Sequence, residues 1–200
     1  MIAVITGDII NSRTEDVAVW LPVLKSELQK IGTDPNDWEI YRGDSFQLKT
    51  TPKLALKVAF KLKTALKQFK TLDVRMAIGI GEESYIADKV TEANGSAYVN
   101  SGECFEELKK QTLAIKTPWK DFNVVLNLVL DVLELTVNNW TPNYALLIKE
   151  SLEDTTVTQK ELAEKLDKKQ SNISTSLKKA GFDEILKILD YYNTQIEKLC

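Results

Sequence analysis

The side chains that could do chemistry in this 200-residue chain are carboxylates, lysines and arginines, because the sequence contains no histidine. Without histidine the chain lacks the commonest general base, the usual nucleophile triads and the mixed His/Cys zinc sites. Its two cysteines, Cys104 and Cys200, have the spacing of neither a metal site nor a disulfide framework. Any chemistry must therefore use acidic and basic side chains with a hard cation such as Mg²⁺ or Mn²⁺.

Two aspartates have the positions that such a cation needs. Asp8 follows the apolar run MIAVIT, and Asp44 lies on the turn of the hairpin WEIYRGDSFQLK. Two carboxylates that meet repel unless a cation lies between them, and Mg²⁺ prefers one or two carboxylates together with substrate phosphates. We therefore expect Asp8 and Asp44 to be metal ligands. A structural explanation stays open for each, Asp44 as a turn former and Asp8 as a helix cap.

The segment that follows Asp8 suits a phosphate group. It leads from a strand into a helix, so its backbone N–H groups and the positive end of the helix dipole attract anions. We expect Ile9, Asn11 and Ser12 to supply these contacts. Arg13 and Arg42 are the nearby candidates for balancing the phosphate charge.

Hydrophobic periodicity predicts the elements that position these residues. The expected helices begin at a Thr14 cap, with a kink or late start at Pro22 and a stop at Gly32, and at Thr51-Pro52. The expected strands are 1–6, the hairpin 38–49, 72–81 and 112–116, with a further helix at 96–110. This β-α-β-β-α-β order, with a further helix in the last connection, indicates an α+β, ferredoxin-like fold, in which an antiparallel sheet carries helices on one face. Its first strand lies antiparallel to the second hairpin strand, which brings Asp8 and Asp44 to one edge.

The helix that begins at Thr51-Pro52 carries six lysines on the half of its wheel opposite the apolar face, at positions 53, 57, 61, 63, 67 and 70. No acidic residue interrupts them. The pattern is typical of a solvated helix face, and a patch for phosphate or nucleic acid is the alternative.

The sequence pattern changes after Pro118-Trp119, because the remaining segments have helical periodicity and none is strand-like. We therefore predict a palm-like domain over residues 1–119 and an all-α domain over residues 120–200. Thr158 and Glu161 form a capping box, which starts a helix-turn-helix over residues 158–180. Its predicted helices span residues 159–166 and 170–180, and a closing helix spans residues 183–199.

The helix-turn-helix has the composition of a DNA-binding module. It holds six lysines against three acids, in a chain whose net charge is -3. The first turns of its second helix carry the short polar side chains that reach base edges, and lysines follow that suit phosphates. The predicted DNA-binding residues are Gln170, Ser171, Asn172, Ser174, Thr175, Lys178 and Lys179. A purely structural helical hairpin is the alternative. One such module binds weakly, so recognition of an operator implies a homodimer.

No apolar run approaches the roughly 18 residues of a membrane-spanning helix. The start MIAVITGDIINSR also lacks the basic leader of a signal peptide. We expect a cytoplasmic protein with no membrane partner.

Four segments resemble the class III nucleotidyl cyclase catalytic domain and related palm domains, namely DIINSR, YRGDSFQ, RMAIGIGE and GSAYVNSGECFEELKK. The resemblance implies that Asp8 and Gly43-Asp44 hold two metal ions and a nucleoside triphosphate. It also implies that Asn100 contacts the nucleotide. Over nearly all 200 residues the chain more closely resembles the SatD family, bacterial proteins that join such a domain to a C-terminal helix-turn-helix.

Three positions depart from the cyclase pattern. Cys104 occupies the place of an arginine that stabilises transition-state charge, and Ile40 occupies that of a base-reading lysine. Ser45 follows Asp44 where diguanylate cyclases place a second acid. Losing one charge-stabilising group commonly costs hundreds-fold in rate, so we expect binding without turnover.

Three functions follow from these observations. The first is a DNA-binding regulator whose cyclase-like domain binds a divalent metal ion or a nucleotide. The second is an active Mg²⁺-dependent nucleotidyl transferase or cyclase, in which the metal ion activates a hydroxyl group. The third is an interaction module without catalysis.

Overall fold

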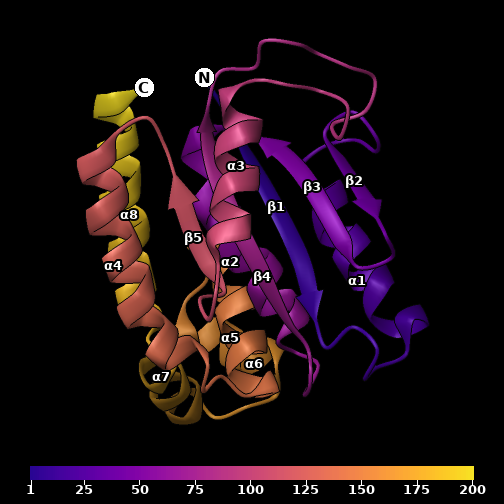
Figure 1. The fold of residues 1–200 in the computed structure, drawn as a ribbon. Coiled ribbons are helices and arrows are strands. Elements are labelled where there is room, and N and C mark those ends of the chain that lie inside the picture. Colours follow the sequence, from indigo (N-terminus) through magenta and orange to yellow (C-terminus); the bar gives the residue numbers. More distant parts are fainter.

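The centre of the molecule is a sheet whose strands are rich in Val, Ile and Ala, most of them buried. The computed structural model describes all 200 residues and gives the strand order β2-β3-β1-β4-β5 (Figure 1). The strands are β1 (Ile2–Ile10), β2 (Trp38–Tyr41), β3 (Ser45–Thr50), β4 (Asp73–Gly81) and β5 (Leu113–Lys116). Neighbours are antiparallel except β4 and β5, which are parallel. The predicted α+β class is confirmed, but the expected purely antiparallel sheet with helices on one face is wrong, because the helix between β4 and β5 crosses the second face and returns the chain to β5 parallel to β4.

Helices cover both faces of the sheet (Figure 1). Helices α1 (Val17–Gln29) and α2 (Pro52–Leu66) pack on the face that contains Ile5, Phe46 and Ile78. Helix α3 (Ser96–Glu107) covers the other face, where the hydroxyl groups of Thr6 and Ser101 lie 2.7 Å apart. The sheet is thus enclosed on both faces over β1 and β4.

The first strand is longer and the first helix starts later than the sequence predicts. β1 continues to Ile10 because β4 pairs with it over its whole length, up to Ile10 opposite Asp73, while β3 pairs with it as far as Asp8. Thr14 does not cap the helix, since its hydroxyl donates to the carbonyl of Asn11. Asp16 caps α1 instead and accepts from the amide of Ala18. α1 then runs through Pro22 and ends before Gly32.

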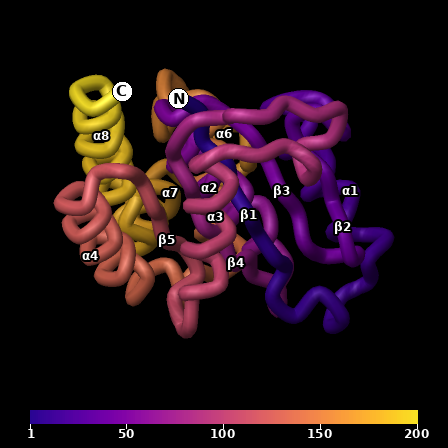
Figure 2. Tube along the Cα trace, turned by 45° about the horizontal axis from the view of Figure 1, so that its top comes forward, coloured from indigo at the N-terminus to yellow at the C-terminus, as the bar shows by residue number.

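Five further helices follow β5. They are α4 (Lys120–Val137), α5 (Pro142–Glu153), α6 (Gln159–Lys165), α7 (Gln170–Lys179) and α8 (Phe182–Leu199). α4 seals the free edge of β5, because the side-chain amide of Asn127 accepts from the N–H and donates to the carbonyl of Ile115. Figure 2 shows α4 and α8 together at this flank, opposite β2. None of the eight helices is both long enough and apolar enough to cross a membrane.

One hydrophobic core spans the predicted boundary at residue 120. A single cluster of 42 buried residues joins Trp20 and Phe46 to Leu126 and Tyr192. The hydroxyl of Tyr192 donates to the carbonyl of Pro52, a residue 140 positions earlier. The C-terminal helices therefore complete the burial of α2.

The lysines of α2 do not form an open basic face. Lys63, which a helical wheel places on the polar side, is 1% exposed and donates to Asp73 and Thr112. Burial lowers the pKa of Lys63 against the opposing effect of Asp73. Lys61 pairs with Glu153 at 2.9 Å. Tertiary contacts that a wheel cannot show have turned much of this face into an interface.

Candidate functional site

Strand pairing brings Asp8 and Asp44 to the same end of the sheet, where β1 finishes and β3 begins, as the strand order predicts. Asp8 on β1 lies opposite Ser45, the first residue of β3. The amide of Ile9 donates to the carbonyl of Asp44 at 3.0 Å. In Figure 1 this end is the lower one, where β1 ends and β2 turns into β3.

Serine hydroxyls hold both carboxylates in place. Ser45 donates to Oδ1 of Asp8 at 3.1 Å, and Ser12 donates to Oδ2 of Asp44 at 2.6 Å. Each contact uses one oxygen of a group that offers about four acceptor positions. Both aspartates thus keep lone pairs for a further ligand while their side chains are oriented.

The environment of Asp8 disfavours a bare negative charge. Partial burial raises the pKa of Asp8, and the hydrogen bond from Ser45 opposes the rise. The nearby Asp44 carboxylate raises this pKa further, and the Arg75 guanidinium lowers it. A cation between the two carboxylates would remove their repulsion.

Arg75 is a site residue that the sequence does not predict. It pairs with Asp8 across β1 and β4, and its Nη2 lies 3.8 Å from Oδ2 of Asp8. The guanidinium carbon lies 4.7 Å from the ring centroid of Phe105, a cation–π contact. Its Nε is buried and has no hydrogen-bond partner. The only signal was its place on a strand next to β1, and sequence does not reveal the register.

The turns around the two aspartates adopt left-handed backbone conformations. Asn11 has φ 61°, Arg42 has φ 55° and Gly43 has φ 91°. Such values suit glycine and asparagine but are unusual for arginine. Arg13 and Arg42 are exposed, and no carboxylate forms an ion pair with either. Both guanidinium groups are therefore available to an anionic ligand.

The predicted phosphate contacts are only partly in place. The amide of Ile9 is used by the sheet, and the side chain of Asn11 donates to the carbonyl of Thr71. Ser12 does lie at the site, through its bond to Asp44. The segment is a continued strand and a turn, so a helix N-terminus does not begin directly after Asp8.

Asn100 does not join this group in the structure. Its side-chain amide donates to the carbonyl of Ile80. Ile80 lies five residues along β4 from Arg75, about 17 Å at the rise of a strand. Cys104 is buried, and burial raises the pKa of its thiol to about 11. A neutral, buried thiol supplies neither the charge of an arginine nor a nucleophile.

No group of three or more Asp, Glu, Cys or His side chains lies close enough together to coordinate a metal ion. The donor set at this end of the sheet is a carboxylate pair with two serine hydroxyls. Oxygen ligands of this kind suit Mg²⁺ or Mn²⁺, which complete their shell with water and phosphate oxygens. The residues present could hold such a cation together with oxygen atoms of a ligand.

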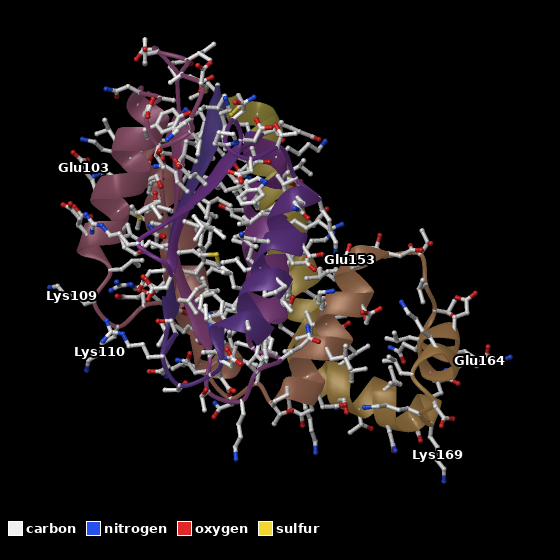
Figure 3. All side chains as sticks on the ribbon, turned by 90° about the vertical axis from the view of Figure 1, so that its right-hand side faces the viewer. Glu103, Lys109, Lys110, Glu153, Glu164 and Lys169 are labelled. Atoms are coloured by element: carbon white, nitrogen blue, oxygen red, sulfur yellow. The ribbon has the colours of Figure 1, made fainter.

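The predicted DNA-binding residues lie on α7 and are exposed. Gln170, Ser171, Asn172, Ser174, Thr175, Lys178 and Lys179 all reach solvent, while Ile173 and Leu177 face the core. The capping box that starts α6 is present, with Thr158 and Glu161 bonded to each other. Figure 3 shows the α6–α7 segment projecting from the body, with Glu164 and Lys169 directed outward.

Comparison with known protein families matches residues 1–194 of the chain to the SatD family. The comparison with curated proteins finds no match.

Proposed function

We propose that the chain, which belongs to the SatD family, is a DNA-binding regulator whose sheet binds a divalent metal ion together with a nucleotide. The observation that carries the proposal is the meeting of Asp8 and Asp44, two carboxylates from distant segments, beside Arg75. The first four strands and helices α1 and α2 support a ferredoxin-like, palm-like assignment. Palm-like sheets use such carboxylates to hold a metal–triphosphate.

Asp8 and Asp44 would hold the metal ion, which would neutralise their repulsion and the charge of the bound phosphates. Ser12 and Ser45 fix the two carboxylates through the hydrogen bonds described above. Carboxylates held in advance lose less side-chain freedom when a ligand binds.

Arg75 would provide the positive charge for a phosphate. At 3.8 Å its contact with Asp8 is too long for a hydrogen bond. A cation bound by Asp8 would take over the neutralisation of that carboxylate. The guanidinium, supported by the Phe105 ring, could then bind a phosphate bidentately. This charge would partly replace the one that Cys104 cannot supply.

The helical half supports DNA binding by a helix-turn-helix. α6 and α7 are joined by a four-residue connection, and α7 presents short polar side chains with two lysines at its end. Residues of this kind make base and phosphate contacts when a recognition helix enters the major groove. A ligand at the sheet would act on α7 only by favouring one arrangement of the helices over another.

Turnover is the second candidate function. The presence of Arg75 beside Asp8 favours it, because one arginine of this kind can stabilise transition-state charge. Release of pyrophosphate from a triphosphate in the presence of Mg²⁺ or Mn²⁺ would establish this activity.

Calorimetry with Mn²⁺ and each of the four ribonucleoside triphosphates tests the site. We expect one or more of them to bind, and Asp44→Asn to weaken that binding at least tenfold, because half of the carboxylate pair is lost. Asp88→Asn, which changes an exposed aspartate in a loop, is the matched control and should bind like the wild type. Equal binding by Asp44→Asn and wild type would refute the metal site.

Gel shifts with a random-sequence duplex test the second half of the proposal. Binding should weaken steeply between 50 and 200 mM salt, as it does when several phosphates are contacted. The double change Lys178→Gln, Lys179→Gln should lower affinity, and Lys25→Gln on α1, also exposed, should not. An affinity that does not respond to salt would argue against DNA contacts.

A further inference from the structure

Helix α4 exposes an apolar stripe to solvent. Five aliphatic side chains on its outer side are 45–71% exposed, namely Val124, Val125, Leu128, Val132 and Leu135. The opposite side of the helix is buried in the core through Phe122, Leu126, Leu130, Leu133 and Val137. The polar side chains Asn123, Asn127 and Glu134 lie on the side toward β5, so α4 has two apolar sides, and an apolar side left exposed is unusual for a surface helix. The outer stripe of α4 therefore has no partner within one copy of the chain.

The spacing of the stripe is that of a helix–helix seam. Leu128 and Leu135 are seven residues apart, as are Val125 and Val132, which keeps them in a straight row when two helices wind around each other. From Val124 to Leu135 the row is about 17 Å long at 1.5 Å per residue. A second helix of similar length would cover it.

A groove of about 740 Å³ continues the stripe between α4 and α8. Its apolar wall includes Leu128 and Val132, so stripe and groove form one surface. Its rim is charged and carries Lys178, Lys179 and Lys187 together with Asp183 and Glu184. The outer side of α4 carries acids, Asp121 and Asp131, among its aliphatic residues.

We infer that this surface is covered by a second copy of the chain, whose α4 crosses the first in antiparallel orientation. A two-fold axis at Leu128 places Val124 opposite the partner's Val132 and Leu128 opposite the partner's Leu128. Asp121 then lies level with the partner's Leu135, at the end of the groove that holds Lys178 and Lys179. The same contact forms twice, so apolar and charged groups are matched on both sides of the axis.

The size of the surface agrees with a homodimer. The exposed aliphatic side chains of α4 present on the order of 500 Å² of apolar area, within the range of functional patches on monomers. A specific interface buries roughly 800 Å² per partner, and the charged rim of the groove would supply the remainder. The inference does not depend on the proposed function. In this dimer Lys178 and Lys179 face the partner's Asp121, so the two copies of α7 would meet DNA through the polar residues at their N-terminal ends, Gln170, Ser171, Asn172, Ser174 and Thr175.

Sedimentation equilibrium between 1 and 100 μM, over the range set by ordinary dimer affinities, tests the inference. We expect a mass twice the 22.6 kDa of one chain. Leu128→Glu should shift the dissociation constant at least tenfold toward monomer, with an unchanged far-UV spectrum. Val19→Glu on α1, where the side chain is 56% exposed, is the matched control and should remain dimeric.

A wild-type chain that is monomeric at 100 μM would overturn the inference, whether or not a different protein later proves to bind the stripe. A dimer that survives Leu128→Glu would also overturn it, because the interface would then lie elsewhere.

A charge exchange tests the orientation of the two copies. Asp121→Lys and Lys178→Glu should each weaken the dimer, and the double variant should recover affinity because the attraction is restored with its sign reversed. A double variant no tighter than the weaker single variant would refute the antiparallel arrangement, even if Leu128→Glu dissociates the dimer.

Discussion

At the scale of single residues, the candidate site depends on which side chains adjoin Asp8. The sequence predicts Asp8 and Asp44 from their chemistry and from the turns that carry them. It does not predict Ser45 and Arg75 as neighbours of Asp8, because that requires the register of β1 against β3 and β4. Register is set by tertiary packing, and shifting it by one residue turns every side chain to the other face.

The role of Arg75 can be separated from that of the carboxylates. Arg75→Gln should weaken binding of a metal–triphosphate about tenfold, roughly 1.4 kcal/mol, because a phosphate loses its cation. Binding of Mn²⁺ alone should not weaken, since the guanidinium competes with the metal ion for Asp8. Calorimetry with and without nucleotide measures both. Equal loss of both affinities would mean that Arg75 acts by shaping the sheet and not by contacting phosphate.

Lys63 shows that periodicity can also assign a buried residue to the surface. Periodicity assigns it to the polar face of α2, yet Asp73, Thr112 and the carbonyl of Val74 surround its ammonium group. A buried charge requires such partners. They come from β4 and from the segment before β5, which no helical wheel includes.

At the scale of elements, the sequence predicts most helices and strands, because apolar periodicity and caps are local signals. Thr158, for example, caps α6 by accepting from the amide of Glu161, as the capping box predicts. The predicted end of the first strand at residue 6 is wrong, because pairing with β3 and β4 extends β1 beyond Gly7. The first helix was misplaced for a related reason, since Thr14 is engaged by Asn11 and by Thr71, 57 residues away.

Because α3 packs closely on the sheet, two glycines there should respond to alanine substitution in opposite directions, one losing and one gaining stability. A Cβ on Gly79 would lie 2.2 Å from the carbonyl oxygen of Ala97 and from the amide of Ser101. Gly79→Ala should therefore lower the free energy of unfolding by about 2 kcal/mol or more. Gly102 lies on α3, and a Cβ added there would meet no atom within 4 Å, so Gly102→Ala should raise it by up to about 1 kcal/mol.

Urea unfolding at constant pH measures both glycine variants. Equal stability of Gly79→Ala and the wild type would show that α3 can move away from β4 without cost. That result would also weaken the link between Phe105 on α3 and Arg75 on β4.

At the scale of the whole molecule, the two predicted regions form one packed body. Charged groups meet where α1, α2 and α5 join, and Glu153 accepts from Lys30 at 2.7 Å and from Lys61 at 2.9 Å. Glu27, which is 5% exposed, also pairs with Lys30. The sequence could predict a boundary from the loss of strand patterns, but not this shared interface.

The charge cluster makes stability depend on pH. Burial raises the pKa of Glu153, but the hydrogen bonds from Lys30 and Lys61 outweigh that effect and lower this pKa from 4.5 to about 2. A lowered pKa means stabilisation that is complete above about pH 4.5 and is lost as the pH falls toward 2. Glu153→Gln should therefore cost about 2 kcal/mol at pH 7, after allowance for solvent screening of a partly exposed group. The cost should shrink between pH 4.5 and 2.

Urea unfolding at a series of pH values checks this dependence. Glu197→Gln is the control, because the pair of Glu197 with Lys53 is 60% exposed on both sides and should contribute little at any pH. A constant difference between Glu153→Gln and wild type from pH 7 to pH 3 would contradict the ionic origin of the stabilisation.

The contact between Tyr192 and Pro52 has a consequence for how the chain matures during synthesis. The first 119 residues are synthesised before α5 and α8, which pack on α2, and before α4, which covers the edge of β5. Until α4 emerges, the backbone groups of Ile115 that Asn127 later satisfies remain open. The surface of α2 therefore stays partly exposed until α8 has been made. While the edge of β5 is also uncovered, the nascent chain offers a chaperone an exposed strand edge to protect.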